Sequence, residues 1–233
     1  MTLGVIIIAH NKENGIAKCL RSVIFQTRKA DGIWLIAHNC TDKTVEIARA
    51  YPEVQIVEYN SPAGIVYART KAFEVASTDL IASIDGDSWA DTDWLDGLFK
   101  VISKNGVSGA GGAVIFTNSV KARLLSYNFF FIQRLFRPTR QFYFWGSNYI
   151  CRREDFFRVG GIQDLLELKN KIGLRYAAED LYLALKLKKL GKVVFAPGAV
   201  VYSVAKQTEN SENRGYLNRQ DKIKLFKYFG IIR

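Results

Sequence analysis

The chain contains few prolines and cysteines, which are abundant in disordered proteins, in disulfide-bonded secreted proteins and in zinc-binding proteins. Its 233 residues include four prolines and three cysteines, with no low-complexity tract and no internal repeat. This composition argues against a disordered linker. Cys19, Cys40 and Cys151 are scattered, which fits neither a zinc site nor a disulfide framework, and an odd number is typical of a reducing compartment.

Long hydrophobic runs are also missing. The apolar run Leu3–Ala9 is too short to span a membrane and lacks the basic flank of a signal peptide. We therefore expect a cytoplasmic protein. Its length suits one large domain, and 48% apolar residues are ordinary for a globular protein.

Acidic residues are in deficit. The 33 Lys and Arg residues against 22 Asp and Glu residues give a formal net charge of +11. Such an excess of positive charge indicates what the protein binds and not how it folds. The candidate partners are an anionic membrane surface, nucleic acid or a polyanionic substrate.

Short apolar runs alternate with helical patterns in the first half of the chain. Strands are predicted at 3–9, 32–37, 54–57 and 80–84, and helices after residue 16, at 44–50 and at 64–76. Such alternation implies right-handed βαβ units and a mostly parallel sheet. This layout is typical of nucleotide-binding proteins, but it does not assign a function.

The second half is less regular. Helices are predicted at 94–104, near 153–159 and at 179–190, with a strand at 111–116 and a strand pair around 193–202. Residues 118–151 contain no acidic residue and interleave Lys and Arg with many aromatic side chains. A basic amphipathic tail follows at 217–233.

Two carboxylates follow the apolar run 80–84, in Asp85-Gly86-Asp87. Residues two apart in extended backbone point the same way, and ligands bind at the carboxyl ends of strands in open α/β sheets. Oxygen ligands suit a hard cation such as Mg²⁺ or Mn²⁺. One hypothesis is a metal-assisted enzyme that acts on a phosphorylated or nucleotide-linked substrate, and the alternative is an acidic surface turn.

Several segments occur in an order that resembles family-two glycosyltransferases, over about residues 3–203. They are VIIIAHNKE at 5–13, CLRSV and QT within 19–27, NCTDKT at 39–44, DGD at 85–87, GSN at 146–148, RR at 152–153, GGI at 160–162 and EDL at 179–181. The resemblance implies the α/β GT-A fold, a Rossmann-like arrangement with a mostly parallel central sheet flanked by helices. It implies a transferase domain at 1–205, with a nucleotide-sugar half at 1–116 and an acceptor half at 117–205, before the tail at 206–233.

The resemblance further implies inverting transfer of a sugar from a nucleotide-diphosphate sugar to a hydroxyl of a glycan or lipid-linked acceptor, with Mn²⁺ or Mg²⁺ as cofactor. Asp87 is assigned to the cation, with Asp85 nearer the ribose or sharing the metal. Asp180, beside Glu179, is assigned as the general base at a helix start, where the helix dipole favours the ionised form. The alternative is that both acids only complement that dipole.

Further positions follow from the same resemblance. The nucleotide-sugar site would be lined by Ala9, His10, Asn11, Glu13, His38, Arg69, Asp85, Gly86, Asp87, Arg152 and Arg153, and the acceptor side by Trp145, Gly146 and Asn148. The arginines would neutralise phosphate, and ordinary surface charge is the alternative for them.

Two positions depart from the family pattern. His38 stands where many relatives place an aspartate that contacts the base, which puts a uridine donor in doubt. Ser203 lies where a histidine often completes the metal shell, so the cation would depend on phosphates and water.

The basic tail and the stretch 118–151 both suggest a membrane surface. Leu225, Phe226 and Phe229 can form an apolar face among lysines, as in peripheral membrane helices. We expect peripheral docking at the inner face of the membrane, and the alternative is that these aromatics belong to the core.

Three other functions are alternatives to this one. A sugar-phosphate nucleotidyltransferase would need a glycine-rich basic loop after the first strand, which is absent. A non-catalytic nucleic-acid-binding module, or a transferase that acts on modified nucleic acid, would also use the positive charge and the aromatics.

Overall fold

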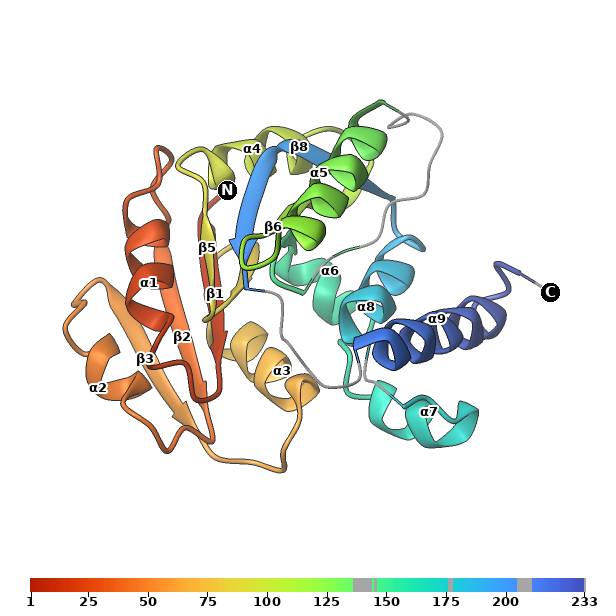
Figure 1. The fold of residues 1–233 in the computed structure, drawn as a ribbon, viewed down its shortest axis with the longest axis horizontal. Coiled ribbons are helices and arrows are strands. Elements are labelled where there is room, and N and C mark those ends of the chain that lie inside the picture. The colour runs from red at the N-terminus through yellow and green to blue at the C-terminus, as the bar shows by residue number, and fades with distance from the viewer. Residues whose placement is uncertain (136–143, 145, 176–177, 205–210, 233) are drawn as a thin grey trace.

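The computed structural model describes residues 1–135, 144, 146–175, 178–204 and 211–232, within which eight strands form one mixed sheet (Figure 1). The order across the sheet is β3-β2-β1-β4-β7-β6-β8-β5. The strands are Leu3–Ala9 (β1), Gly32–His38 (β2), Val54–Tyr59 (β3), Leu80–Asp85 (β4), Ser88–Ala90 (β5), Val107–Phe116 (β6), Tyr149–Arg152 (β7) and Lys192–Ser203 (β8).

Helices cover both faces of this sheet. They are Ile16–Ile24 (α1), Thr44–Ala48 (α2), Ile65–Val75 (α3), Trp94–Ile102 (α4), Val120–Leu135 (α5), Arg153–Arg158 (α6), Leu165–Ile172 (α7), Glu179–Leu187 (α8) and Ser211–Tyr228 (α9). In Figure 1, α1 and α2 lie on one side of β1–β3, while α3 and α8 lie on the other. None of the helices in the described part of the chain has the length and apolar character needed to cross a lipid bilayer.

The first half confirms the predicted parallel sheet. Strands β3, β2, β1 and β4 are parallel neighbours, so their carboxyl ends lie at one edge. β1 is buried along its whole length. Its Ile6 and Ile8 belong to one hydrophobic cluster and its Val5 and Ile7 to another, which explains why the sequence shows an unbroken apolar run there.

The second half departs from the prediction around 193–202. Instead of a strand pair, one long strand, β8, runs parallel to β6. Their register shifts between Gly111 and Ala113, opposite the part of β8 that contains Pro197 and Gly198. A bulge-like irregularity accommodates a proline that cannot donate a ladder hydrogen bond.

The C-terminal helix is present as α9, but its apolar face packs inward. Leu225 is fully buried, and Phe226 and Phe229 pack against the same cluster as Ile6 and Ile8. The Phe229 ring lies 5.6 Å from the Tyr182 ring of α8. The expectation that this face meets a membrane is therefore wrong, and the alternative of internal packing holds for these three side chains.

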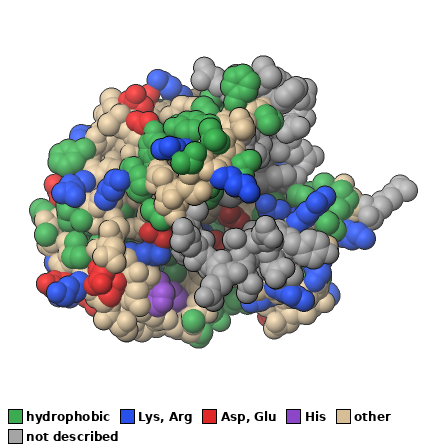
Figure 2. All heavy atoms as spheres, viewed as in Figure 1, with side chains coloured by type: hydrophobic (Ala, Val, Ile, Leu, Met, Phe, Trp, Pro, Cys, Tyr) green, Lys and Arg blue, Asp and Glu red, His purple; other side chains and the backbone are tan. Residues whose placement is uncertain are grey.

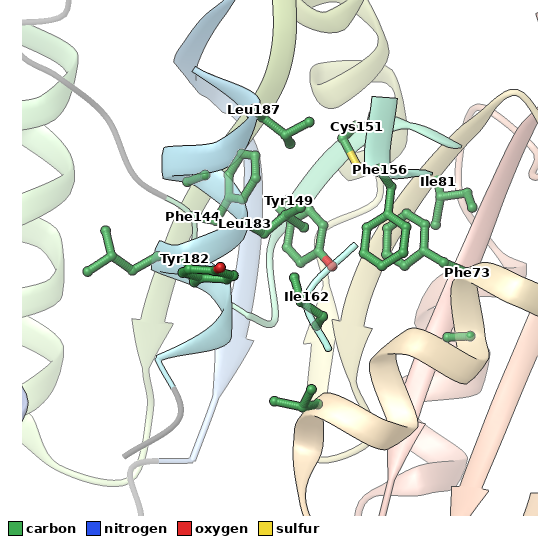
Figure 3. Close-up of a cluster of buried hydrophobic side chains, with 14 of the residues drawn as sticks. Phe73, Ile81, Phe144, Tyr149, Cys151, Phe156, Ile162, Tyr182, Leu183 and Leu187 are labelled. Carbon is green, nitrogen blue, oxygen red and sulfur yellow. The ribbon is translucent and has the colours of Figure 1, made fainter. Parts of the chain in front are cut away.

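An aromatic cluster joins the sheet to α3, α6 and α8 (Figure 3). The rings of Phe73 on α3 and Phe156 on α6 stack with centroids 3.8 Å apart. Tyr149 on β7 stacks on Phe144 at 4.8 Å. This cluster fixes the positions of α3 and of β7, both of which carry side chains discussed below.

Replacing Phe156 by alanine should therefore destabilise the protein by about 3–5 kcal/mol, because it leaves a cavity beneath the Phe73 ring. Chemical denaturation measures the loss. Phe157→Ala is the matched control, because that neighbouring ring is 44% exposed, and it should cost clearly less. Equal losses for both variants would contradict the packing described.

Candidate active site

A cleft of about 520 Å³ opens at the carboxyl ends of β1 and β4. It brings together residues from β1, α3, β4, β6, β8 and α8. Its lining consists of Ile8, His10, Lys12, Ile65, Arg69, Asp85, Asp87, Val114, Phe116, Gly146, Ser147, Glu179, Asp180, Ser203 and Val204. Figure 2 shows acidic side chains recessed in a hollow near the centre of one face.

The tight turn after β4 positions the two carboxylates of Asp85 and Asp87. The Gly86 N–H donates to the Ile8 carbonyl oxygen at 2.9 Å, which holds the turn against β1. A Cβ at Gly86 would lie 3.0 Å from the Ala9 Cβ and 3.3 Å from that same oxygen. Glycine therefore allows the close approach that places both carboxylates in the cleft.

Arg69 on α3 is the buried centre of the site, with a side chain only 1% exposed. Its Nη1 donates to the Ser83 Oγ at 3.0 Å and to the Gly146 carbonyl at 2.8 Å. Its Nη2 lies 3.6 Å from the Asp85 Oδ1 and 3.4 Å from the Glu179 Oε1. One guanidinium thus links β4, the chain before β7, and α8.

Helix α8 begins directly at the acidic pair. The residue before it, Ala178, has a φ of 41°, a left-handed conformation that is uncommon for a residue with a Cβ. Such conformations persist only where their surroundings hold them, and they cluster at functional sites. Glu179 and Asp180 follow, and both line the cleft.

Glu179 and Asp180 have different surroundings. Burial raises the pKa of Glu179 from its ordinary 4.5 to about 7, against the opposing effect of Arg69 and with a smaller raising effect from Asp180. Asp180 accepts the Gly146 N–H at 3.0 Å on one oxygen and its neighbour Leu181's N–H at 2.7 Å on the other. Backbone donors therefore hold the Asp180 carboxylate in place.

A residue with no predicted role, Lys12, lies opposite. Its Nζ is 2.5 Å from the Asp87 Oδ2. Its backbone N–H donates to the Thr44 Oγ at 2.6 Å, which anchors the loop after β1. Lys12 lies within the VIIIAHNKE segment, directly after Asn11. This position was the sequence signal that could have identified it as a residue of the site.

The predicted base and ribose residues are only partly in the cleft. His10 lines it, and its Nδ1 lies 2.8 Å from the His38 carbonyl oxygen. His38 itself is buried, with its Nε2 2.9 Å from the Ser61 Oγ, and burial lowers its pKa. Ala9 is buried in the core.

Asn11 and Glu13 serve instead to tie two loops together. The Asn11 Oδ1 accepts the Thr41 N–H at 2.8 Å, and a Glu13 carboxylate oxygen accepts the Lys43 N–H at 3.2 Å. Asn11 has a φ of 51°, a conformation that asparagine tolerates better than most residues.

Two predicted arginines are not brought to the cleft, and that expectation is corrected. Because β7 runs antiparallel to β4, Arg152 pairs with Leu80, at the opposite end from Asp85. Arg152 donates to the carbonyls of Val107 and Ile102, and Arg153 donates to the carbonyl of Phe73. Both guanidiniums satisfy backbone carbonyls there.

Of the predicted acceptor-side residues that the structure describes, one lines the cleft and one does not. Gly146 lines the cleft, and a Cβ there would lie 3.1 Å from the Arg69 Nη2. Asn148 is fully buried and bonds to the Trp94 indole and to two backbone carbonyls, so its role here is structural. Trp145 lies outside the described residues.

The residues present fit a divalent cation that arrives with a phosphorylated ligand. Across the described ranges, no three His, Cys, Asp or Glu side chains come together as a complete metal shell. Asp85 and Asp87 nevertheless both line the cleft. Mg²⁺ is commonly held by one or two carboxylates plus substrate phosphates, which is the ligand set this cleft can offer.

Comparisons with known proteins agree with this architecture. The family model described as glycosyl transferase family 2 matches residues 4–160. Glycosyltransferase AglE of Haloferax volcanii is 33% identical over 121 residues, which are 49% of this chain and 40% of that protein. The matched segment thus spans less than half of this curated relative.

Solved structures show the same fold. The mannosyltransferase PcManGT from Pyrobaculum calidifontis, in complex with GDP-Man and Mn²⁺, superimposes with a TM-score of 0.75 at 17% identity, over 99% of this chain and 64% of that chain. Glucosyl-3-phosphoglycerate synthase from Mycobacterium tuberculosis, in complex with Mg²⁺ and UDP, gives a TM-score of 0.65 at 16% identity, over 100% and 80%.

The chain therefore has the GT-A fold of these solved structures. The chain belongs to glycosyl transferase family 2, because that family's model matches well over half of it.

The raised pKa of Glu179 predicts a pH dependence of stability. A carboxyl whose pKa is higher in the folded than in the unfolded chain stabilises the fold below pH 4.5, and this stabilisation is lost as pH rises through about 7. Relative to Glu179→Gln, the wild type should lose roughly 3 kcal/mol of unfolding free energy over that window. Denaturation at a series of pH values measures this loss, and parallel curves for the two proteins would contradict it.

Proposed function

We propose that this glycosyltransferase is an inverting enzyme that uses a nucleotide-diphosphate sugar and a divalent cation, with Asp180 as its general base. The proposal is carried by the convergence of Asp85, Asp87, Glu179 and Asp180 on one cleft at the carboxyl ends of β1 and β4. In open α/β sheets this edge is where ligands bind. The division into a nucleotide-sugar half at 1–116, an acceptor half at 117–205 and a tail at 206–233 is part of the proposal.

The donor side is assigned to the β4 turn. Asp87 and Asp85 would hold Mn²⁺ or Mg²⁺, which supplies Lewis-acid stabilisation of the charge on the departing diphosphate. The solved relatives that contain Mn²⁺ with GDP-Man, or Mg²⁺ with UDP, support this assignment. Arg69 holds Asp85 in place from beneath.

The acceptor side is assigned to α8 and Gly146. The acceptor hydroxyl oxygen forms a bond to the anomeric carbon, while the bond from that carbon to the diphosphate oxygen breaks. The hydroxyl proton passes to Asp180, whose carboxylate is oriented by the backbone N–H groups of Gly146 and Leu181. A positioned base of this kind contributes about 10²–10⁴-fold in rate.

Sugar nucleotides screened with Mn²⁺ or Mg²⁺ for release of nucleoside diphosphate test this function. Asp180→Asn should lower turnover by about 10²-fold or more while leaving donor affinity nearly unchanged, because the proton acceptor is lost while the β4 turn that would hold the metal is untouched. Asp87→Ala should reduce donor affinity and turnover together. Near-normal transfer by Asp180→Asn would exclude Asp180 as the base.

We further propose that the acceptor is lipid-linked and that α5 docks on an anionic membrane surface. Four large side chains at helical spacing are exposed on α5: Val120 at 66%, Leu124 at 60%, Tyr127 at 48% and Phe131 at 63%. Lys121 and Arg123 are exposed on the same helix. In Figure 2, hydrophobic and basic side chains lie together on the upper part of the face, where Figure 1 places α5.

The position of α5 supports a lipid-linked acceptor. Val114 and Phe116 at the end of β6 line the cleft, and α5 begins four residues later. The Thr117 N–H donates to the Ser203 carbonyl oxygen at 3.0 Å, which fixes that connection to the cleft wall. A helix that lies on a bilayer would therefore bring the cleft to the membrane surface, where a lipid carrier presents its sugar.

Binding to vesicles of phosphatidylcholine with phosphatidylglycerol measures this docking. Leu124→Asp with Phe131→Asp should reduce binding by about tenfold or more, because each buried CH₂ contributes about 0.8 kcal/mol and each basic residue near anionic lipid about 1 kcal/mol. Phe25→Asp is the control, since Phe25 is 68% exposed and lies on the loop after α1. Equal vesicle binding by all three proteins would contradict the proposal. Retention of the protein on DNA and not on vesicles would also contradict it and would favour a nucleic-acid acceptor.

A further inference from the structure

Among the described residues that line the cleft, acidic side chains outnumber cationic ones. Its described lining carries four acidic side chains, from Asp85, Asp87, Glu179 and Asp180. Against these stand two cationic side chains, Arg69 and Lys12. A nucleoside diphosphate brings further negative charge, so the free energy of donor binding depends on which cation can turn toward it.

The Arg69 guanidinium is already occupied by contacts within the protein. Its guanidinium is buried and contacts Asp85 and Glu179, and it donates to the Gly146 carbonyl. Moving it toward a ligand would break these contacts and leave two carboxylates without their buried counter-charge, which is costly. Arg69 therefore acts as a fixed support.

Lys12 has a fixed backbone and an adaptable side chain. Its N–H is bonded to Thr44, and its carbonyl oxygen accepts the N–H groups of Gly15 and Ile16 at 2.9 and 2.8 Å. Its side chain is 21% exposed at the cleft wall, and its four-carbon stem allows the charge to move while the loop stays in place.

The pairing of Lys12 with Asp87 has a consequence for metal binding. Asp87 is the carboxylate assigned to the cation, and its Oδ2 lies 2.5 Å from the Lys12 Nζ. A cation that binds Asp87 must compete with this ammonium group. The competition ends only if the ammonium group acquires another anionic partner.

We infer that Lys12 is an exchangeable counter-ion that couples the metal to the donor diphosphate, an inference that rests on the proposed function. Before the donor binds, Lys12 neutralises Asp87 and weakens its affinity for free metal. When the diphosphate enters, Lys12 releases Asp87 and pairs with a phosphate oxygen. Metal and nucleotide then bind cooperatively, because each removes an obstacle to the other.

The inference predicts two affinity changes of opposite sign in Lys12→Met. Without nucleotide, Mn²⁺ measured by electron paramagnetic resonance should bind about 2–5-fold tighter, since a competing ion pair is lost. With saturating Mn²⁺, the affinity for a nucleoside diphosphate, measured by calorimetry with UDP, GDP, CDP, ADP and dTDP in turn, should fall by about tenfold or more. Lys12→Arg should retain most of the wild-type behaviour.

Lys18→Met is the matched control. It removes the same charge from α1, where the Lys18 ammonium group lies over the Trp89 ring and not in the cleft. It should leave both affinities unchanged.

The outcomes separate this inference from the function on which it rests. If Lys12→Met weakens Mn²⁺ binding or leaves it unchanged, Lys12 is only a structural partner of Asp87 and the inference is wrong, even when the wild type transfers sugar. If the wild type binds none of the five nucleotides with Mn²⁺, the proposed function fails, and the inference fails with it.

Discussion

The buried guanidinium of Arg69 is the contact on which the cleft depends. It reaches Asp85 at the end of β4, Glu179 at the start of α8, and the Gly146 carbonyl before β7. These three segments come from distant parts of the chain, and two of them bring acidic side chains that share this one cation. Burying that cation is acceptable because nearly all of its donors find oxygen acceptors, although its Nε has no partner in the described structure.

Around Arg69 the two halves of the molecule have different tasks. The parallel strands β1 and β4 supply a rigid edge, where the Gly86 turn holds its carboxylates close to β1. The antiparallel strand β7 brings Gly146 to the same edge from the other half, and Gly146 in turn orients Asp180 through its N–H. Asp85 on β4 and Asp180 on α8 are thus linked through the Arg69 side chain and the Gly146 backbone.

The sequence predicted the parallel half well because β1, β2 and β4 are mostly apolar runs and helical patterns lie between the strands. It also assigned Asp85, Asp87, Arg69, Gly146, Glu179 and Asp180 to one site, and the structure places all six along the cleft. It failed where strand direction decides the outcome. Arg152 resembles a phosphate ligand in sequence, but the antiparallel course of β7 carries it to the far end of the sheet. Lys12 was missed because its partner Asp87 is 75 residues away.

The packing of α9 gives the end of the chain a connection to the acids of α8. Asp221 is buried and accepts the Arg175 N–H at 3.0 Å, three residues before the left-handed Ala178 that precedes Glu179. Leu225 and Phe229 anchor the same helix on the core beside Tyr182. A chain shortened after β8 would lose the acceptor of the Arg175 N–H and the ring that packs against Tyr182. The terminal helix is therefore in direct contact with the helix that carries Glu179 and Asp180.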